Sequence, residues 1–232
     1  LSARLPEDCV ALGKNAATLE LDRRQKKWVV ITQGRERIQA HGVILATPSY
    51  VSAEIVSGLS SELSARLRDI PYSSAATVNL AYRRDQIPHP LDAFGFVVPA
   101  VEKFSSIACT FSSVKYPERA PAGSVLIRAF LGGATRASML DRSDDEMKTA
   151  VQRDLARLLE INTPPLFHRI TRYNRVLPTY RVGHLDLVQG IERAVGDFPA
   201  LALAGNAYRG VGIPDCVHSG EEAAEKIVGQ LA

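Results

Sequence analysis

Hydrophobic and polar positions in the first fifty residues predict a series of short strands. Residues 17–21 alternate weakly between apolar and polar, and the run WVVI at 28–31 is rich in residue types that favour strands. Gln, Gly and Arg at 33–35 predict a hairpin turn between that run and a strand at 37–40. The run VILA at 43–46 is short and entirely apolar, which predicts a strand buried on both faces.

The rest of the chain predicts a central sheet flanked by helices. Strands are expected at 75–82, 94–99, 107–111, 124–131 and 170–177. Helices are expected at 49–67 with a break at Gly58, at 143–159, at 185–195 and at 221–231. Ser60 or Ser61 is the expected cap of the part after Gly58, and Ser143 with Glu146 has the form of a capping box. The middle third is thus expected to be mainly a sheet, and the chain as a whole is expected to have an α+β fold.

Size, charge and cysteine content restrict the function classes. The 232 residues suffice for one large or two small domains, 46% of them are hydrophobic, and the net charge is +3. The 28 basic residues are scattered, so a nucleic-acid partner is not expected. No apolar run approaches the ~20 residues of a membrane span, and a signal peptide is not expected in the first residues, LSARLP, because a long apolar core is missing there. The three cysteines at 9, 109 and 216 form no CxxC pair and no disulfide framework is expected from them, so each is expected to be a small buried residue in a reduced, cytoplasmic protein.

The segment GNAYRGVGIPDCVHSG at 205–220 carries the main chemical signal. An apolar run at 200–204 precedes it and a helix-like run at 221–231 follows it, which predicts a strand, a glycine-rich loop and a helix. That order directs free backbone N–H groups and a helix N-terminus toward one place, which suits a phosphate or another electron-rich group. A complete GxGxxG motif is absent, since Asp215 stands where the last glycine belongs. Histidine spacing predicts no metal site, and HExxH, GxSxG and P-loop motifs are absent, so no catalytic side chain is assigned.

This glycine-rich segment resembles the C-terminal flavin-binding signature of the protoporphyrinogen oxidase family, which uses FAD and belongs to the amine-oxidase-like flavoproteins. Other segments resemble that family in the same order: AHGVILATP at 40–48, FGFVVP at 94–99, YPERAP at 116–121, FLGG at 130–133 and PTYRVGH at 178–184. The resemblance covers essentially the whole chain. It implies that the chain is the C-terminal half of a protein about twice its length, whose first half contains the missing GxGxxG unit.

The resemblance also assigns parts of the chain to domains. Residues 1–50 are expected to be a strand meander of a Rossmann-like, amine-oxidase-type FAD-binding domain, residues 51–169 the mixed-sheet substrate-binding domain, and residues 170–232 the C-terminal part of the FAD-binding domain. The implied activity is FAD-dependent oxidation of a porphyrinogen to a porphyrin with molecular oxygen, in haem biosynthesis. Protoporphyrinogen IX and coproporphyrinogen III both remain open as the substrate. The alternatives are a related flavin amine oxidase or carotenoid desaturase, or a folded module that is inert when isolated from its N-terminal half.

Residues that contact the cofactor follow from the resemblance. Val211, Gly212 and Ile213 are expected beside the isoalloxazine ring and ribityl chain of FAD. Glycine permits close approach of the backbone, and the helix dipole favours negative charge on a reduced flavin. Gly205 and Tyr208 complete the cofactor-binding set in this loop.

The resemblance also implies one more residue beside the flavin and several around the substrate. Tyr173 is expected beside the flavin, where the family has an aromatic residue, often tryptophan. Val97, Thr110 and Phe130 are expected to line an apolar pocket for the macrocycle, although Thr110 departs from the leucine that is common there. Candidates for binding the carboxylate arms are Arg128, Arg136, Arg172 and Arg175. Oligomeric state and peripheral membrane association stay open.

Overall fold

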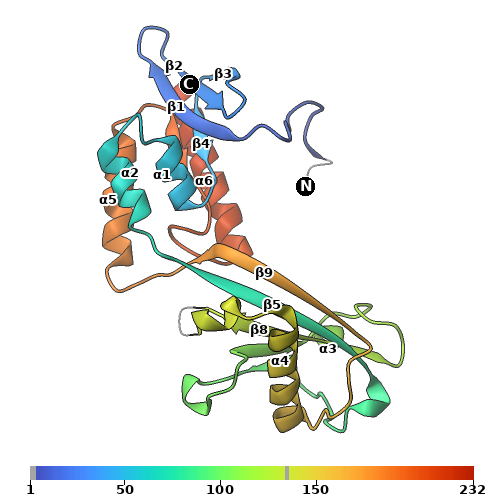
Figure 1. The fold of residues 1–232 in the computed structure, drawn as a ribbon. Coiled ribbons are helices and arrows are strands. Elements are labelled where there is room, and N and C mark those ends of the chain that lie inside the picture. Colours follow the sequence, from blue (N-terminus) through green and yellow to red (C-terminus); the bar gives the residue numbers. More distant parts are fainter. Residues whose placement is uncertain (1–3, 134–135) are drawn as a thin grey trace. The chain divides into compact units, whose positions relative to one another are not determined.

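The computed structural model describes residues 4–133 and 136–232 and divides the chain into two compact units (Figure 1). The first unit contains the residues up to Pro71 together with Tyr180–Ala232, and the second unit is Tyr72–Thr179. The expected domain boundaries after residues 50 and 169 lie earlier than these. The difference arises because the helices after residue 48 pack within the first unit, whereas the long strand that begins at Phe167 pairs within the second.

The strands of the first unit form two small sheets. Strands β1 (Ala16–Asp22), β2 (Lys27–Thr32) and β3 (Arg37–Ala40) pair antiparallel in chain order. The predicted hairpin turn between β2 and β3 is confirmed, since the Arg35 N–H donates to the Thr32 carbonyl oxygen over 2.9 Å. Strands β4 (Val43–Leu45) and β10 (Leu201–Leu203) pair parallel to each other.

The predicted burial of β4 on both faces is wrong. Ile44, at the centre of this strand, is 38% exposed. Among the described residues β4 pairs with β10 alone, so it belongs to a two-stranded sheet and not to the interior of a large one. Leu45, which points to the opposite face, is buried.

The helices of the first unit are α1 (Ser49–Ile55), α2 (Ser61–Arg68), α5 (His184–Gly196) and α6 (Ile213–Leu231). The predicted break at Gly58 is confirmed, and Ser60 caps α2 by accepting a hydrogen bond from the Leu63 N–H over 3.2 Å. The start predicted for the last helix is wrong, because α6 begins at Ile213 instead of residue 221. Pro214 fits the first helical turn, where its missing N–H costs no intrahelical bond.

The second unit is built on one antiparallel sheet with the strand order β6-β7-β8-β5-β9. The bounds of its elements are β5 (Tyr72–Arg83), η2 (Arg84–Gln86), β6 (Gly95–Val97), η3 (Ala100–Glu102), β7 (Ala108–Phe111), α3 (Ser112–Lys115), β8 (Ser124–Gly132), η4 (Ala137–Asp141), α4 (Asp144–Leu159) and β9 (Phe167–Pro178). Helix α4 begins with the predicted capping box, in which the Ser143 N–H donates to Glu146 Oε2 over 2.8 Å. Hydrogen bonds from Ser143 hold the pKa of the Glu146 carboxyl below its ordinary value.

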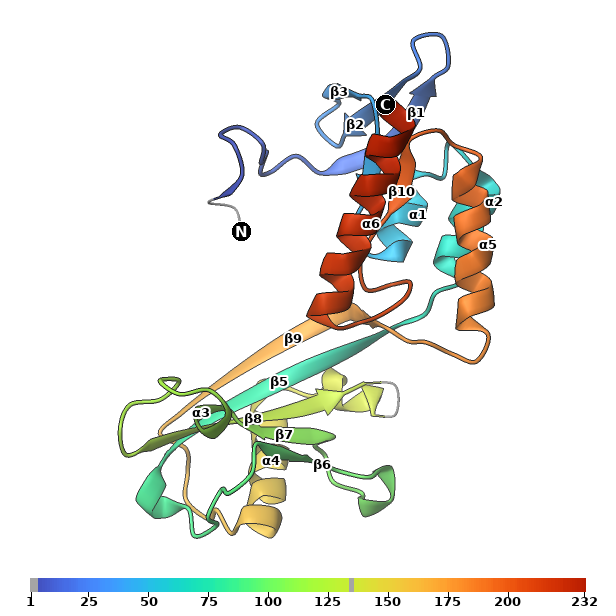
Figure 2. The same cartoon turned by 180° about the vertical axis from the view of Figure 1, so that it is seen from behind.

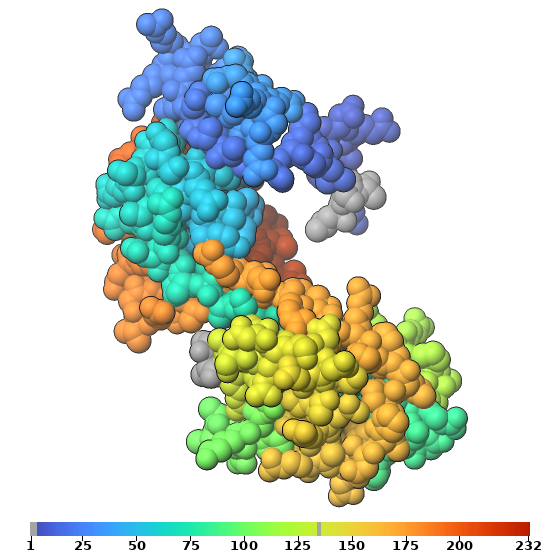
Figure 3. Space-filling view, viewed as in Figure 1, coloured from blue at the N-terminus to red at the C-terminus, as the bar shows by residue number. Residues whose placement is uncertain are grey.

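Helix α4 covers one face of this sheet and leaves the opposite face open. The side chains of Val78, Leu80 and Ile127 are fully buried in the cluster that also contains Met147 and Val151 of α4. Figure 3 shows the covered side, where residues of η4 and α4, coloured yellow to gold, face the viewer. Figure 2 shows the sheet from behind, with α4 lying beyond the strands. The open face carries partly exposed side chains such as Phe130 and the exposed Arg128.

The three cysteines differ in burial, so the expectation that each is buried holds for only one of them. Cys109 on β7 is buried, Cys216 is partly exposed and Cys9 is exposed. Burial raises the pKa of the Cys109 thiol to about 12. Burial is also the main reason that the pKa of the neighbouring Tyr82 is raised to about 12.

We expect an alkylating reagent at pH 8 to modify Cys9 rapidly and Cys109 only after denaturation. The thiolate is the reactive form, and Cys109 is both inaccessible and protonated at this pH. Peptide mapping by mass spectrometry over a time course measures the two rates. Equal rates for Cys9 and Cys109 in the native protein would contradict the burial of β7.

Candidate functional site

The glycine-rich loop between β10 and α6 runs from Gly205 to Gly212. Gly205 has φ +115°, a backbone conformation that side chains rarely adopt, and its N–H donates to Ser219 Oγ over 3.0 Å. A Cβ atom at Gly210 would come within 2.5 Å of the Asp215 side chain. Two glycines of the loop are therefore required by its shape, independently of any ligand.

Two side chains hold this loop in place, one from the segment just before α5 and one from the first residue of α5. The Tyr180 hydroxyl donates to the Asn206 carbonyl oxygen over 2.7 Å. Nε2 of His184 lies 2.8 Å from the Tyr208 carbonyl oxygen, to which it donates. The two rings are stacked, with centroids 3.8 Å apart, and His184 is buried. Neither Tyr180 nor His184 was assigned a role from the sequence, although their spacing of four residues in PTYRVGH was the signal available.

A third contact joins the loop to α5 from the solvent side. Arg209 donates to both carboxylate oxygens of Glu192, from Nε over 2.9 Å and from Nη2 over 2.7 Å. Both side chains are about half exposed, so solvent weakens this pair, but the bidentate geometry fixes the direction of Arg209. Residues 206, 208 and 209 of the loop are thus all anchored to the region around α5.

The three residues expected beside the flavin ring form an exposed corner at the start of α6. Val211 is 59% exposed, Ile213 is 82% exposed, and Gly212 lies between them. Asp215 Oδ2 accepts a hydrogen bond from the Gly212 N–H over 3.1 Å. A carboxylate therefore already occupies the place where the helix N-terminus would attract an anion, which disfavours a phosphate there. The exposed apolar side chains of Val211 and Ile213 flank a glycine that lets a ligand approach the backbone closely. This arrangement suits an aromatic ring better than a phosphate.

Gly205 and Tyr208 do not share that corner. Both line a cavity of about 500 Å³ between α5, β10 and α6, and the Tyr208 side chain is buried. The cavity wall is mostly apolar, and it also includes the charged residues Glu222 and Lys226 of α6. The loop residues predicted to bind cofactor thus separate into an exposed group at 211–213 and a group that faces this cavity.

The predicted substrate residues lie together on the open face of the sheet in the second unit. Val97 on β6 is opposite Ala108, which is opposite Phe130 on β8. Thr110 lies on the same face, two residues after Ala108 along β7, and is opposite Arg128. Residues that pair directly across antiparallel strands point to one face, so Val97, Thr110 and Phe130 share the surface opposite α4.

Tyr173, the residue expected beside the flavin, also lies on this open face. It pairs with Ala75 of β5, two positions before Thr77, which pairs with Phe130. Its side chain is 42% exposed. Tyr173 and Phe130 therefore place two aromatic rings on this surface of the second unit.

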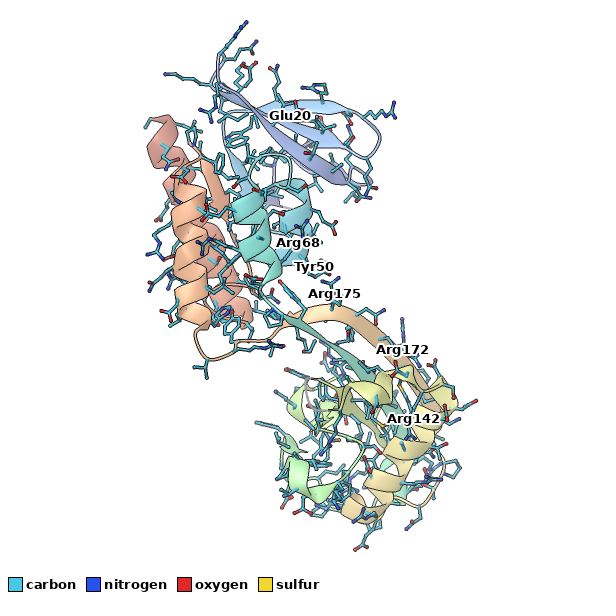
Figure 4. The ribbon with its side chains drawn as sticks, turned by 60° about the vertical axis from the view of Figure 1, so that its left-hand side comes forward. Glu20, Tyr50, Arg68, Arg142, Arg172 and Arg175 are labelled. Atoms are coloured by element: carbon cyan, nitrogen blue, oxygen red, sulfur yellow. The ribbon has the colours of Figure 1, made fainter. Side chains whose placement is uncertain are left out.

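Two of the four candidate arginines are engaged elsewhere. Arg172 forms an ion pair with Asp144 at the start of α4. Its Nη2 also donates to the Arg142 carbonyl oxygen over 2.6 Å, and Figure 4 shows Arg172 and Arg142 close together. Arg136 donates from Nη1 to the Ser106 carbonyl oxygen over 2.6 Å. Arg172 also pairs with Ala76, whose side chain is on the covered face. Of the four, Arg128 is placed by the register on the same face as Phe130.

The described residues contain neither a cluster of metal ligands nor a helix able to span a membrane. Within residues 4–133 and 136–232, no group of three or more His, Cys, Asp or Glu side chains is placed to hold a metal ion. In the same residues, no helix combines the length and the apolar character needed to cross a bilayer.

Curated relatives of this chain are named for two porphyrinogen oxidases. The chain is 32% identical to coproporphyrinogen III oxidase of Bacillus subtilis, over 80% of this chain and 39% of that protein. It is 28% identical to coproporphyrinogen III oxidase of Staphylococcus aureus, over 96% of this chain and 47% of that protein. It is 31% identical to the chloroplastic protoporphyrinogen oxidase of Oryza sativa subsp. japonica, over 84% of this chain and 38% of that protein. The chain thus spans less than half the length of each of these relatives.

Comparison with solved structures and with a family model relates the chain to flavoproteins as well. A protein of Exiguobacterium sp. 255-15, provisionally assigned as a protoporphyrinogen oxidase, matches with a TM-score of 0.80 and 28% identity, over 94% of this chain and 47% of its own. Reduced UDP-galactopyranose mutase matches with a TM-score of 0.77 at 16% identity over 100% of this chain and 50% of its own, a likeness of fold alone. The predicted α+β fold of amine-oxidase type is therefore confirmed. The model of the family described as flavin containing amine oxidoreductase matches residues 3–228, and the chain belongs to that family.

Proposed function

We propose that this chain provides the flavin-ring loop and the substrate face of an FAD-dependent oxidase that converts a porphyrinogen to a porphyrin, with molecular oxygen as the final electron acceptor. The observation that carries the proposal is the open sheet face, where Val97, Phe130 and Tyr173 offer apolar and aromatic surface for a broad ring. Relatives named for porphyrinogen oxidation match most of the chain, which supports this choice of ring.

The residues at 211–213 fit the flavin that the family contains. When bound, FAD supplies the oxidising chemistry by accepting a hydride from a carbon of the substrate. The chain's own part is to present Val211 and Ile213 as apolar contacts and the Gly212 backbone as a close approach. Tyr180 and His184 keep the loop in one conformation, so that this corner does not reorganise when a ring binds.

An amine oxidase is the weaker alternative. The register places Arg128 and Arg169 on the open face, and the five strands of the second unit, all within the described residues, contain no aspartate or glutamate. A protonated amine is repelled by such a surface, whereas a porphyrinogen with carboxylate arms is attracted. The proposal also places the enzyme in a reducing, cytoplasmic compartment, since the three cysteines are unpaired.

The proposal predicts that the natural protein containing this chain, loaded with FAD, converts at least one porphyrinogen to its porphyrin in air. Porphyrin fluorescence follows product formation with protoporphyrinogen IX and with coproporphyrinogen III, and an oxygen electrode follows the acceptor. A reaction without enzyme corrects for spontaneous oxidation. If neither substrate reacts faster than that blank, the proposed activity is wrong.

A further inference from the structure

We propose that Arg128 and Arg169 form a carboxylate-binding row on the open face of the sheet, and that this row makes coproporphyrinogen the preferred substrate. The inference rests on the proposed function. It concerns a different property, the discrimination between two porphyrinogens that differ in the number of their carboxylate arms.

The strand register places the two arginines in one row. Thr110 of β7 is opposite Arg128 of β8, Arg128 is opposite Asn79 of β5, and Asn79 is opposite Arg169 of β9. All four side chains therefore point to the open face. Neighbouring strands lie about 4.8 Å apart, so the backbones at Arg128 and Arg169 are separated by about 10 Å. Side chains as long as arginine can bind one carboxylate together or two carboxylates separately across that distance.

Asn79 orients the first of these arginines. Nε of Arg128 donates to Asn79 Oδ1 over 2.8 Å, and Asn79 Nδ2 donates to the Arg169 carbonyl oxygen over 3.4 Å. The Asn79 side chain is therefore held between the two neighbouring strands, and it holds the guanidinium in turn. The two terminal nitrogens of Arg128 have no partner among the described residues, and neither has the guanidinium of Arg169. Both groups keep donors for a ligand.

The strands around the row supply no counter-charge. None of the five strands contains an aspartate or a glutamate. Phe130 lies two residues from Arg128 along β8 and points to the same face, about 7 Å away. A ligand that covers Phe130 with an apolar ring therefore brings its acidic arms to Arg128. A porphyrinogen is a molecule that combines an apolar ring with carboxylate arms.

The row distinguishes the two substrates because they differ at the edge of the ring. Coproporphyrinogen III has carboxylate arms at positions where protoporphyrinogen IX has apolar vinyl groups. An unpaired guanidinium facing a vinyl group gains nothing and loses part of its hydration, whereas a carboxylate makes charge-assisted hydrogen bonds. Two arginines with free donors on one face therefore favour the substrate with more carboxylates.

The test compares Arg128→Met and Arg169→Met with Arg153→Met in the FAD-loaded protein. Arg153 is an exposed arginine of α4, on the other side of the sheet, and serves as the matched control for loss of one charge. For each row variant we expect kcat/KM for coproporphyrinogen III to fall about 10- to 100-fold, the size of a lost charge-assisted hydrogen bond, with a smaller loss for protoporphyrinogen IX. Arg128→Lys should recover part of the loss, and Arg153→Met should change neither value.

Binding of the two porphyrin products, measured by fluorescence titration, gives a readout that does not depend on turnover. We expect Arg128→Met to weaken coproporphyrin binding more than protoporphyrin binding. Variants with unchanged circular dichroism and flavin content that lose both substrates equally, or neither, would overturn the carboxylate row. A wild-type protein that oxidises neither porphyrinogen instead rejects the proposed function, so the two failures are distinct.

Discussion

Replacing His184 with alanine is expected to destabilise the first unit by about 3 kcal/mol, because it removes a buried hydrogen bond and a ring contact at once. The Tyr208 carbonyl oxygen loses the donor that lies 2.8 Å away, and the Tyr180 ring loses its stacking partner. The chain contains a single tryptophan, Trp28, which is buried in the first unit. Its fluorescence in a urea titration therefore reports this unit's unfolding separately from the second.

The same substitution is expected to reduce the amount of FAD that the natural protein retains. Residues 211–213 follow directly on the part of the loop that His184 fixes, so a looser loop presents the flavin-ring corner in several conformations. The flavin-to-protein absorbance ratio after gel filtration measures retention. His41→Ala is the control, since His41 is an exposed residue of the same unit. A His184→Ala protein with the stability and flavin content of His41→Ala would show that the loop needs no such anchor.

Replacing Phe130 with alanine is expected to raise KM for the porphyrinogen about 10- to 100-fold, the effect of losing the burial of one aromatic side chain. Phe130 lies between Ala108 and Thr77 on the open face, where the macrocycle is proposed to bind. Flavin content should stay unchanged, because the flavin-ring corner belongs to the other unit. This separation of KM from flavin content distinguishes a substrate contact from a general loss of structure.

Initial rates over a range of substrate concentrations, with flavin content measured on the same samples, test this expectation. Leu166→Ala is the control for loss of an apolar side chain, since Leu166 is 60% exposed and lies just before β9. If Phe130→Ala and Leu166→Ala have the KM of the wild type, the macrocycle does not bind over Phe130. If Phe130→Ala loses flavin, the residue acts on the fold.

Local signals in the sequence predicted much of the fold. Ser143 and Glu146 specify the start of α4 by themselves, and Ser60 does so for α2, because a helix cap depends on residues that are neighbours in the chain. The start of α6 was mispredicted because Pro214 and Asp215 are common in loops as well as in first helical turns. The contact of Asp215 with Gly210 and Gly212, which the sequence does not show, decides that this segment is a first helical turn and not a loop.

The sequence indicated individual residues of the candidate sites but not their arrangement in space. The resemblance indicated Val97, Thr110 and Phe130, and the register then placed them on one face. Arg169 was not considered, since its position beside Asn79 joins strands about ninety residues apart in the chain. Such pairings arise from packing over long sequence separations, which no local pattern encodes.

Anaerobic mixing of the FAD-loaded natural protein with each porphyrinogen tests the proposed function most directly, because it isolates the transfer of electrons from substrate to flavin. Stopped-flow absorbance follows the oxidised flavin band while the porphyrin band appears. We expect the flavin to bleach as porphyrin forms, faster with coproporphyrinogen III than with protoporphyrinogen IX, and to recover its absorbance when oxygen is admitted. A flavin band that stays unchanged with both substrates would contradict the proposal that this chain belongs to a porphyrinogen oxidase.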